Sequence, residues 1–264
     1  MIPIHDDNPT HHVPVVTLAL IISCTLVFLW ELNTPLSHER LIYGLGVTPA
    51  VLFGEHVQHP HSLLVPPWLT VFTSMFMHGG WLHLLGNMLF LWIFGNNIED
   101  RLGHVRYLVF YLLCGVIAVL ANALPNIKSM VPMIGASGAI AGILGAYLIL
   151  YPHARILVII PIFFFIQALW WPAWVVLAIW FALQIISSLL TAGAQGGVAW
   201  AAHIGGPFFV VEPLYRTVCQ SPVLLFNTSA LNSCHRPPDD GPHMRAFTSS
   251  GNYRHLTDYR PRTP

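Results

Sequence analysis

The sequence predicts an all-α polytopic membrane protein with six transmembrane helices, on the basis of three observations. Only 8% of the 264 residues are charged, whereas ~25% is usual in soluble globular proteins. Hydrophobic residues make up 55% of the chain, and the mean hydropathy is +0.63. The charged residues also leave five gaps, each able to hold a membrane span of ~20 residues: 8–30, 56–98, 107–127, 129–154 and 156–211. We therefore expect a bilayer as the solvent, which excludes a disordered chain, a nucleic-acid binder and an ordinary soluble enzyme.

The six spans are placed by the ends of the apolar runs. Residues 1–13 form a short N-terminal segment, and the connection over 32–67 is too polar and broken to cross a membrane. A partly amphipathic stretch over 68–77 precedes the second span. The spans are expected at about 14–31, 81–98, 106–124, 137–151, 173–190 and 198–211.

Prolines set several of these boundaries, because proline disrupts a helix interior. Pro125 ends the third span, Pro152 ends the fourth, and Pro172 divides the long uncharged stretch. We interpret 156–169 as an apolar interfacial connection, too short to cross comfortably. Residues 212–264 contain seven prolines and six of the eleven basic residues, so the predicted domain organisation is a membrane domain over 14–211 followed by a disordered tail.

The basic residues predict the orientation. Six spans place both termini on one side, together with nine of the eleven basic residues: Arg101, Arg106, Arg155 and the six tail arginines. Only Arg40 and Lys128 lie on the other side. The positive-inside rule then predicts cytoplasmic termini, and we expect a bacterial plasma membrane. The four cysteines show no disulfide pattern and are expected to be free thiols.

Polar side chains inside spans are costly and indicate function. His83 and Asn87 are four residues apart and share one helix face. Ser137 stands at a helix start, where free backbone N–H groups favour a developing anion. His203 lies among small residues, and the fourth span offers matching ones in Gly138, Ala141, Gly142 and Gly145, so a contact between the fourth and sixth spans would join serine and histidine.

Depth supports one common site. Counting ~1.5 Å per residue across a ~30 Å core, Ser137 lies about 9 Å below the outer face. His83 and Asn87 fall about 6 and 12 Å below it, and His203 about 16 Å deep. A water-accessible pocket opening outward is expected.

These residue types support acyl transfer. A serine hydroxyl needs a neutral imidazole to take its proton, and the oxyanion needs preorganised donors. Ser137 would attack and His203 would act as base and then acid, while the Ser137 N–H, His83 and Asn87 would bind the oxyanion. Residues 56–98 and 156–211 contain no carboxylate to orient His203, so a Ser-His dyad is expected.

Four motifs resemble those of the rhomboid intramembrane serine proteases. In family order they are His78 to Asn87 (HGGWLHLLGN), Gly95 to Gly103 (GNNIEDRLG), Gly135 to Gly138 (GASG) and Ala202 to Gly206 (AHIGG). The resemblance implies a six-helix rhomboid-like bundle, the Ser137/His203 dyad, oxyanion groups at His83 and Asn87, and support from His78, Gly135, Gly138 and Gly206. It also implies cleavage of single-span membrane proteins, with the bilayer as the other partner and no metal or organic cofactor. The oligomeric state stays open.

Other functions remain to be weighed. The main alternative is a catalytically inactive rhomboid-like protein that binds transmembrane helices for trafficking or quality control. A transporter lacks support, because the spans show no internal repeat and no carboxylate to couple ions. Gly-x-Ser-x-Gly fails at Ala139, and His-Glu-x-x-His is absent. We expect structural roles for Glu99 and a solvated loop for His56, His59 and His61.

Overall fold

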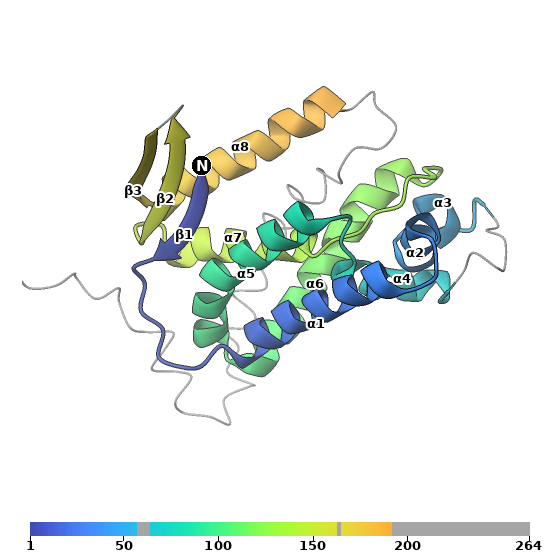
Figure 1. Cartoon of the computed structure of the whole chain (residues 1–264), viewed down its shortest axis with the longest axis horizontal. Coiled ribbons are helices and arrows are strands. Elements are labelled where there is room, and N and C mark those ends of the chain that lie inside the picture. The colour runs from blue at the N-terminus through green and yellow to red at the C-terminus, as the bar shows by residue number, and fades with distance from the viewer. Residues whose placement is uncertain (57–63, 163–164, 192–264) are drawn as a thin grey trace, which may run out of the picture.

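The chain folds into a helical bundle with a small sheet at one end (Figure 1). The computed structural model describes residues 1–56, 64–162 and 165–191. The five long helices are α1 (Val15–Asn33), α5 (Trp81–Leu102), α6 (His104–Ala123), α7 (Ser137–Leu150) and α8 (Ala173–Thr191). Between α1 and α5 lie the short helices α2 (His38–Leu45), α3 (Pro49–Leu52) and α4 (Thr70–Thr73), with 3-10 turns η1 (Pro67–Leu69) and η2 (Ser74–Phe76). A further 3-10 turn, η3 (Leu124–Asn126), follows α6.

Five of the six predicted helices are confirmed within a few residues at each end. The sixth, predicted at 198–211, lies outside the described residues. Within the described part of the chain, two helices are long and apolar enough to cross a membrane: Val15–Asn33 and His104–Asn126. The apolar helices Ser137–Leu150 and Ala173–Ile186 are shorter. The connection over 32–67 contains short helices rather than a span, as expected.

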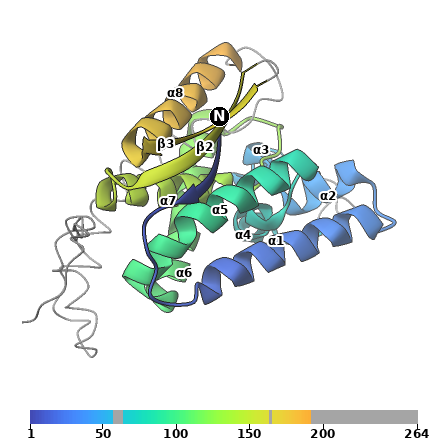
Figure 2. The ribbon, with the colours of Figure 1, turned by 60° about the vertical axis from the view of Figure 1, so that its left-hand side comes forward.

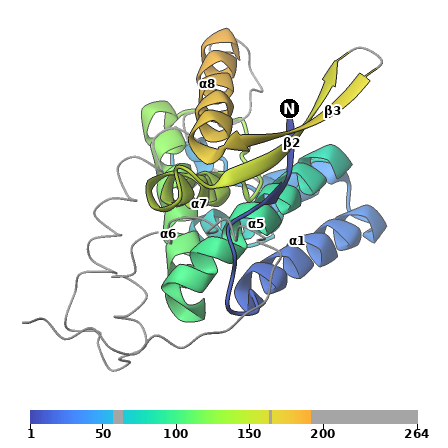
Figure 3. The ribbon, with the colours of Figure 1, turned by 90° about the vertical axis from the view of Figure 1, so that its left-hand side faces the viewer.

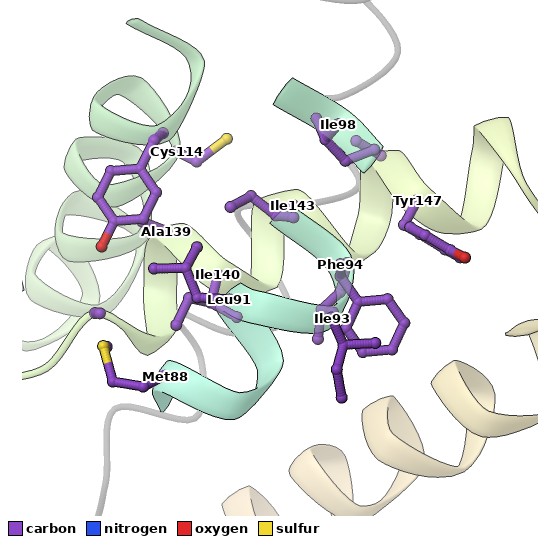
Figure 4. Packing of buried hydrophobic residues seen from close by; sticks show 14 of the residues in the cluster. Met88, Leu91, Ile93, Phe94, Ile98, Cys114, Ala139, Ile140, Ile143 and Tyr147 are labelled. Atoms are coloured by element: carbon purple, nitrogen blue, oxygen red, sulfur yellow. The ribbon is translucent and has the colours of Figure 1, made fainter. Parts of the chain in front are cut away.

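Helix α7 is central, because it packs against both α5 and α6. Figure 4 shows the apolar side chains of α5 and α7 meeting, with Leu91 and Phe94 opposite Ile140 and Tyr147. Phe94 and Tyr147 contact edge to face, with ring centroids 4.9 Å apart. This packing prevents α7 from sliding along α5, and it therefore fixes where α7 starts relative to α5.

Small residues let α6 and α7 approach closely. A β-carbon added to Gly138 would lie 2.6 Å from Cβ of Ala118, and one at Gly142 would overlap Cys114. These two glycines face α6. The sixth span lies outside the described residues, so their predicted contact with it stays a prediction. Ala141 and Gly145 are spaced to share the face of Ser137, so for them the contact with the sixth span stays a prediction. Cys24 and Cys114 are buried free thiols, as expected.

The prediction of a purely helical fold is wrong in one place, since the chain forms a three-stranded antiparallel sheet in the order β1-β2-β3. Strand β1 (Ile2–Asp6) pairs with β2 (Arg155–Ile162), which pairs with β3 (Phe165–Pro172). Figure 2 and Figure 3 show the β2–β3 hairpin between the end of α7 and the start of α8. The predicted interfacial connection over 156–169 is thus a hairpin, and the N-terminal segment supplies its third strand.

Candidate active site

Ser137 is the first residue of α7 and is partly buried. The segment before it is held by backbone hydrogen bonds on two sides. Met133 and Val47 exchange both of their backbone bonds, at 2.8 and 3.0 Å, and the N–H of Gly135 donates to the carbonyl of Ser74 at 2.8 Å. These bonds fix where the helix begins, and therefore where Ser137 stands.

Helix α5 brings His83 and Asn87 to the same place. A β-carbon added to Gly135 would lie 2.7 Å from Nε2 of His83 and 3.7 Å from Nδ2 of Asn87. Both side chains therefore point at the backbone two residues before Ser137. The predicted sharing of one helix face is confirmed, and the structure brings three of the predicted residues, His83, Asn87 and Gly135, together.

Hydrogen bonding decides which His83 nitrogen carries the proton. The backbone N–H of Gly79 donates to Nδ1 of His83 at 3.3 Å, so Nδ1 is an acceptor. A neutral imidazole has one donor and one acceptor, which places the proton on Nε2. The donor of His83 therefore faces Gly135, towards the start of α7.

Asn87 supplies a second donor. Its Nδ2 is buried and has no hydrogen-bond partner among the described residues. A buried amide N–H without an acceptor costs about 1–3 kcal/mol, so its presence next to Gly135 calls for an explanation. An oxyanion bound beside Ser137 would satisfy it.

His78 is fully buried in the turn before α5 and contacts His83 edge to face, with ring centroids 5.1 Å apart. Sequence spacing did not predict this contact, because α5 begins only at Trp81 and helical periodicity does not extend to His78. The Nδ1 of His78 donates to the carbonyl of Phe76 at 3.1 Å. Burial lowers the pKa of His78 to about 4, with a further contribution from His83, so His78 is neutral near pH 7.

The remaining predicted site residues divide into two groups. His203 and Gly206 lie outside the described residues, as do His59 and His61, so the dyad stays a prediction. Gly138 lies against Ala118 of α6 and serves helix packing there.

Glu99 has a structural place, as expected. Its carboxylate accepts hydrogen bonds from the backbone N–H groups of Val16 (2.8 Å) and Thr17 (2.7 Å) at the start of α1, and from the Thr17 hydroxyl (2.7 Å). Nδ1 of His104 lies 2.6 Å from Oε1 of Glu99, the oxygen that also accepts from Val16. A carboxylate from the end of α5 therefore caps the N-terminus of α1.

Glu31, a buried carboxylate in the last turn of α1, is not among the predicted site residues. The available signal was a single acidic residue after 23 uncharged positions, 8–30. The sequence predicts that the first span ends at about residue 31, whereas the helix continues to Asn33.

The chain matches known proteins over much of its length. The family model described as Rhomboid domain matches residues 66–211. The chain is 31% identical over 142 residues to "Rhomboid protein 1, mitochondrial" of Saccharomyces cerevisiae, a match that covers 52% of this chain and 38% of that protein. It is 30% identical over 197 residues to "Presenilin-associated rhomboid-like protein, mitochondrial" of Rattus norvegicus, covering 72% of this chain and 45% of that protein. It is 30% identical over 131 residues to "Rhomboid protease GluP" of Bacillus subtilis, covering 50% of this chain and 23% of that protein.

Two consequences follow from these matches. The matched region of this chain spans less than half the length of each of these relatives. The predicted location in a bacterial plasma membrane, with cytoplasmic termini, is wrong, because the yeast and rat relatives are named as mitochondrial proteins. Composition and charge bias predict a membrane protein but do not distinguish one membrane from another.

Proposed function

The chain belongs to the rhomboid family, and we propose that it is an intramembrane serine endopeptidase that cleaves transmembrane segments of other membrane proteins. The observation that carries the proposal is the convergence of two N–H donors, His83 Nε2 and Asn87 Nδ2, on the backbone just before Ser137. Two N–H donors at this position are suited to binding the negatively charged oxygen of a tetrahedral intermediate, rather than the Ser137 hydroxyl before it reacts. The name of one relative, "Rhomboid protease GluP", supports the same reaction class.

In the proposed mechanism, Oγ of Ser137 attacks the scissile carbonyl while His203 takes the serine proton. The negative charge that develops on the carbonyl oxygen is bound by the N–H of Ser137, His83 Nε2–H and Asn87 Nδ2–H. His203 then gives its proton to the leaving amine, which leaves an acyl-enzyme on Ser137. In the second half of the reaction, His203 takes a proton from a water molecule as that water attacks the acyl-enzyme, and it returns the proton to Oγ of Ser137 as the second product leaves. Each oxyanion donor contributes about 3 kcal/mol to lowering the barrier. The chemistry uses no metal or organic cofactor.

We further propose a six-helix membrane domain over 14–211, with the tail 212–264 outside it. Helix α7 has 14 residues and α6 has 20, so α7 is shorter by six residues, or about 9 Å. This difference agrees with the depth of about 9 Å expected for Ser137, within reach of a substrate span. The mitochondrial relatives support residence in a mitochondrial membrane, where single-span proteins would be the substrates.

The test uses the full chain in detergent micelles with a single-span model substrate that carries helix-destabilising residues. Ser137→Ala and His203→Ala are expected to lower the cleavage rate by a factor of about 10³ or more. Ser129→Ala and His153→Ala, a serine and a histidine away from the site, are matched controls and should cleave at the wild-type rate. Equal cleavage by wild type, Ser137→Ala and His203→Ala would refute the assignment.

The same experiment addresses the alternative, a catalytically inactive rhomboid-like protein that binds transmembrane helices. Under that alternative, the folded wild-type chain would bind the model substrate but would release no cleavage product. Both the serine and the histidine expected of an active member are present at 137 and 203, which favours the protease.

A further inference from the structure

The loop over 133–136, just before Ser137, is held by backbone contacts from two separate parts of the chain. Val47, which follows α2, exchanges both backbone hydrogen bonds with Met133. The carbonyl of Ser74, the first residue of η2, accepts from the N–H of Gly135 at 2.8 Å. The position of the loop therefore depends on how the end of α2 and the start of η2 are placed relative to each other.

The side chain of Thr73 joins these two parts of the chain. Its hydroxyl donates to the backbone carbonyl of Leu45 at 2.6 Å. Leu45 is the last residue of α2, where a carbonyl has no partner within the helix. Thr73 directly precedes Ser74, and Leu45 lies two residues before Val47. The bond thus connects the segment that holds Gly135 to the segment that holds Met133.

These contacts and the short chain segments between them form a closed ring. Its members are, in order, Thr73, Leu45, Val47, Met133, Gly135 and Ser74. A closed ring restrains all of its members, because one contact cannot lengthen unless the others adjust. The contacts at Met133 and Gly135 join backbone groups, so the Thr73 hydroxyl is the link that a substitution can remove.

Gly46 shows how closely the end of α2 approaches the loop. A β-carbon added there would lie 2.8 Å from Cγ2 of Ile134 and 3.1 Å from the carbonyl oxygen of Met133. Ile134 also reaches the turn before α5, since its Cδ1 would lie 3.8 Å from a β-carbon at Gly79. The N–H of Gly79 donates to Nδ1 of His83. A shift of the end of α2 would therefore be transmitted to the turn that orients His83.

We propose that Thr73 is a positioning residue for oxyanion binding, acting through this ring and the loop over 133–136. Its hydroxyl holds the end of α2 against the start of η2, which keeps Gly135 where the donors of His83 and Asn87 converge. The inference rests on the proposed function for its catalytic consequence, but not for the placement of the loop. Thr73 acts on the loop and not on the substrate.

The test compares variants of the full chain in micelles that separate the bond from the bulk of the side chain. Thr73→Val keeps the branched shape and removes the donor, whereas Thr73→Ser keeps the donor. Thr70→Val is the matched control, because the Thr70 hydroxyl donates to the carbonyl of Pro67 at 2.5 Å, close to Thr73 but outside the ring. Thr73→Ala, which also lacks the donor, replaces Thr73→Val if that variant does not fold.

Hydrogen exchange of the Met133 and Gly135 amides, resolved by NMR, measures the loop directly. Exchange is expected to be at least about tenfold faster in Thr73→Val than in wild type, because the opened ring lets the loop open more often. Thr73→Ser and Thr70→Val should stay within about threefold of wild type. Wild-type exchange at both amides in folded Thr73→Val would overturn the proposal, whatever the cleavage rate. Equal acceleration in Thr70→Val would also overturn it, because general loosening would then explain the effect.

Kinetics provide the second readout. Thr73→Val is expected to lower kcat about tenfold with KM within about twofold, because oxyanion donors act in the transition state. Thr73→Ser should restore kcat to within about twofold of wild type. An unchanged kcat in a Thr73→Val chain whose loop exchanges faster would refute the positioning role. Absence of cleavage by wild type would instead count against the protease assignment and leave the exchange measurement valid.

Discussion

At the scale of single residues, Gly135 determines how closely α5 and the start of α7 can approach. Its φ is +119°, a conformation that L side chains rarely adopt. A β-carbon there would also lie 2.7 Å from Nε2 of His83. Glycine is therefore required twice, once for the backbone conformation and once for the space that brings His83 to the start of α7.

Gly135→Ala is expected to lower both stability and activity. The backbone strain alone costs about 1–2 kcal/mol, and the added methyl group must displace the His83 ring from its donor position. We expect a lower melting temperature in micelles and a cleavage rate reduced at least tenfold, measured with the model substrate. Gly86→Ala, on the same turn of α5 as Asn87, is the control, because a β-carbon there meets no atom within 4 Å. Equal effects of the two substitutions would contradict this account.

The sequence predicted part of the site at this scale. The spacing of His83 and Asn87 predicted one face of a helix, and α5 confirms it. The contact of His78 with His83 and the buried position of Glu31 were not predicted. Both depend on where a helix starts or stops to within one turn, a detail that hydrophobic periodicity does not define.

At the scale of secondary structure, the helices were predictable and the sheet was not. Prolines and charges mark the helix ends along the chain, so local sequence defines them. Strand β2, with the sequence RILVIIPI, is rich in β-branched residues, yet a short apolar run of this kind is equally compatible with an interfacial segment. Its partner β1 lies about 150 residues earlier, as in the pair Ile2 and Ile159, and no local pattern reports such a pairing.

The contact between α5 and α1 depends on Glu99, so Glu99→Ala is expected to destabilise the bundle by about 3 kcal/mol or more. The substitution leaves the backbone N–H groups of Val16 and Thr17 without their acceptor, and it leaves the Thr17 hydroxyl with the longer bond to the Tyr107 hydroxyl alone. Thermal unfolding in micelles measures the effect.

Asp100→Ala is the matched control for Glu99→Ala. Asp100 accepts from the exposed segment at His11 and His12, where the His12 side chain is 72% exposed. We expect a loss below about 1 kcal/mol. A smaller loss for Glu99→Ala than for Asp100→Ala would show that the cap is not the source of the stability.

At the scale of the whole molecule, the first seven residues join elements far apart in the sequence. Asp6 is 6% exposed, and its Oδ2 accepts from Asn97 Nδ2 of α5 (2.7 Å) and from the Tyr147 hydroxyl of α7 (2.8 Å). Beside it, Asp7 bonds the backbone of Arg155 through both its N–H and its carboxylate. The N-terminal strand thus connects α5, α7 and the hairpin that leads to α8.

This connection is expected to weaken as the pH rises. Burial raises the pKa of Asp6 above its usual 3.8, partly offset by the bonds from Tyr147 and Asn97. A raised pKa means that the folded state binds the proton more tightly than the unfolded state does. The contribution of Asp6 to stability is therefore fully present below pH 3.8 and decreases as the pH rises through its folded pKa.

Hydrogen exchange of the β1–β2 amides, expressed as protection factors between pH 4 and 7, measures this dependence. In wild type the protection should fall with rising pH. Asp6→Asn keeps a neutral side chain with an acceptor for Asn97 and Tyr147, so its protection should be independent of pH and at least equal to wild type at pH 7. Asp7→Asn is the control and should retain the wild-type slope. A flat wild-type profile, or a slope that persists in Asp6→Asn, would show that the ionisation of Asp6 does not govern the attachment of the strand.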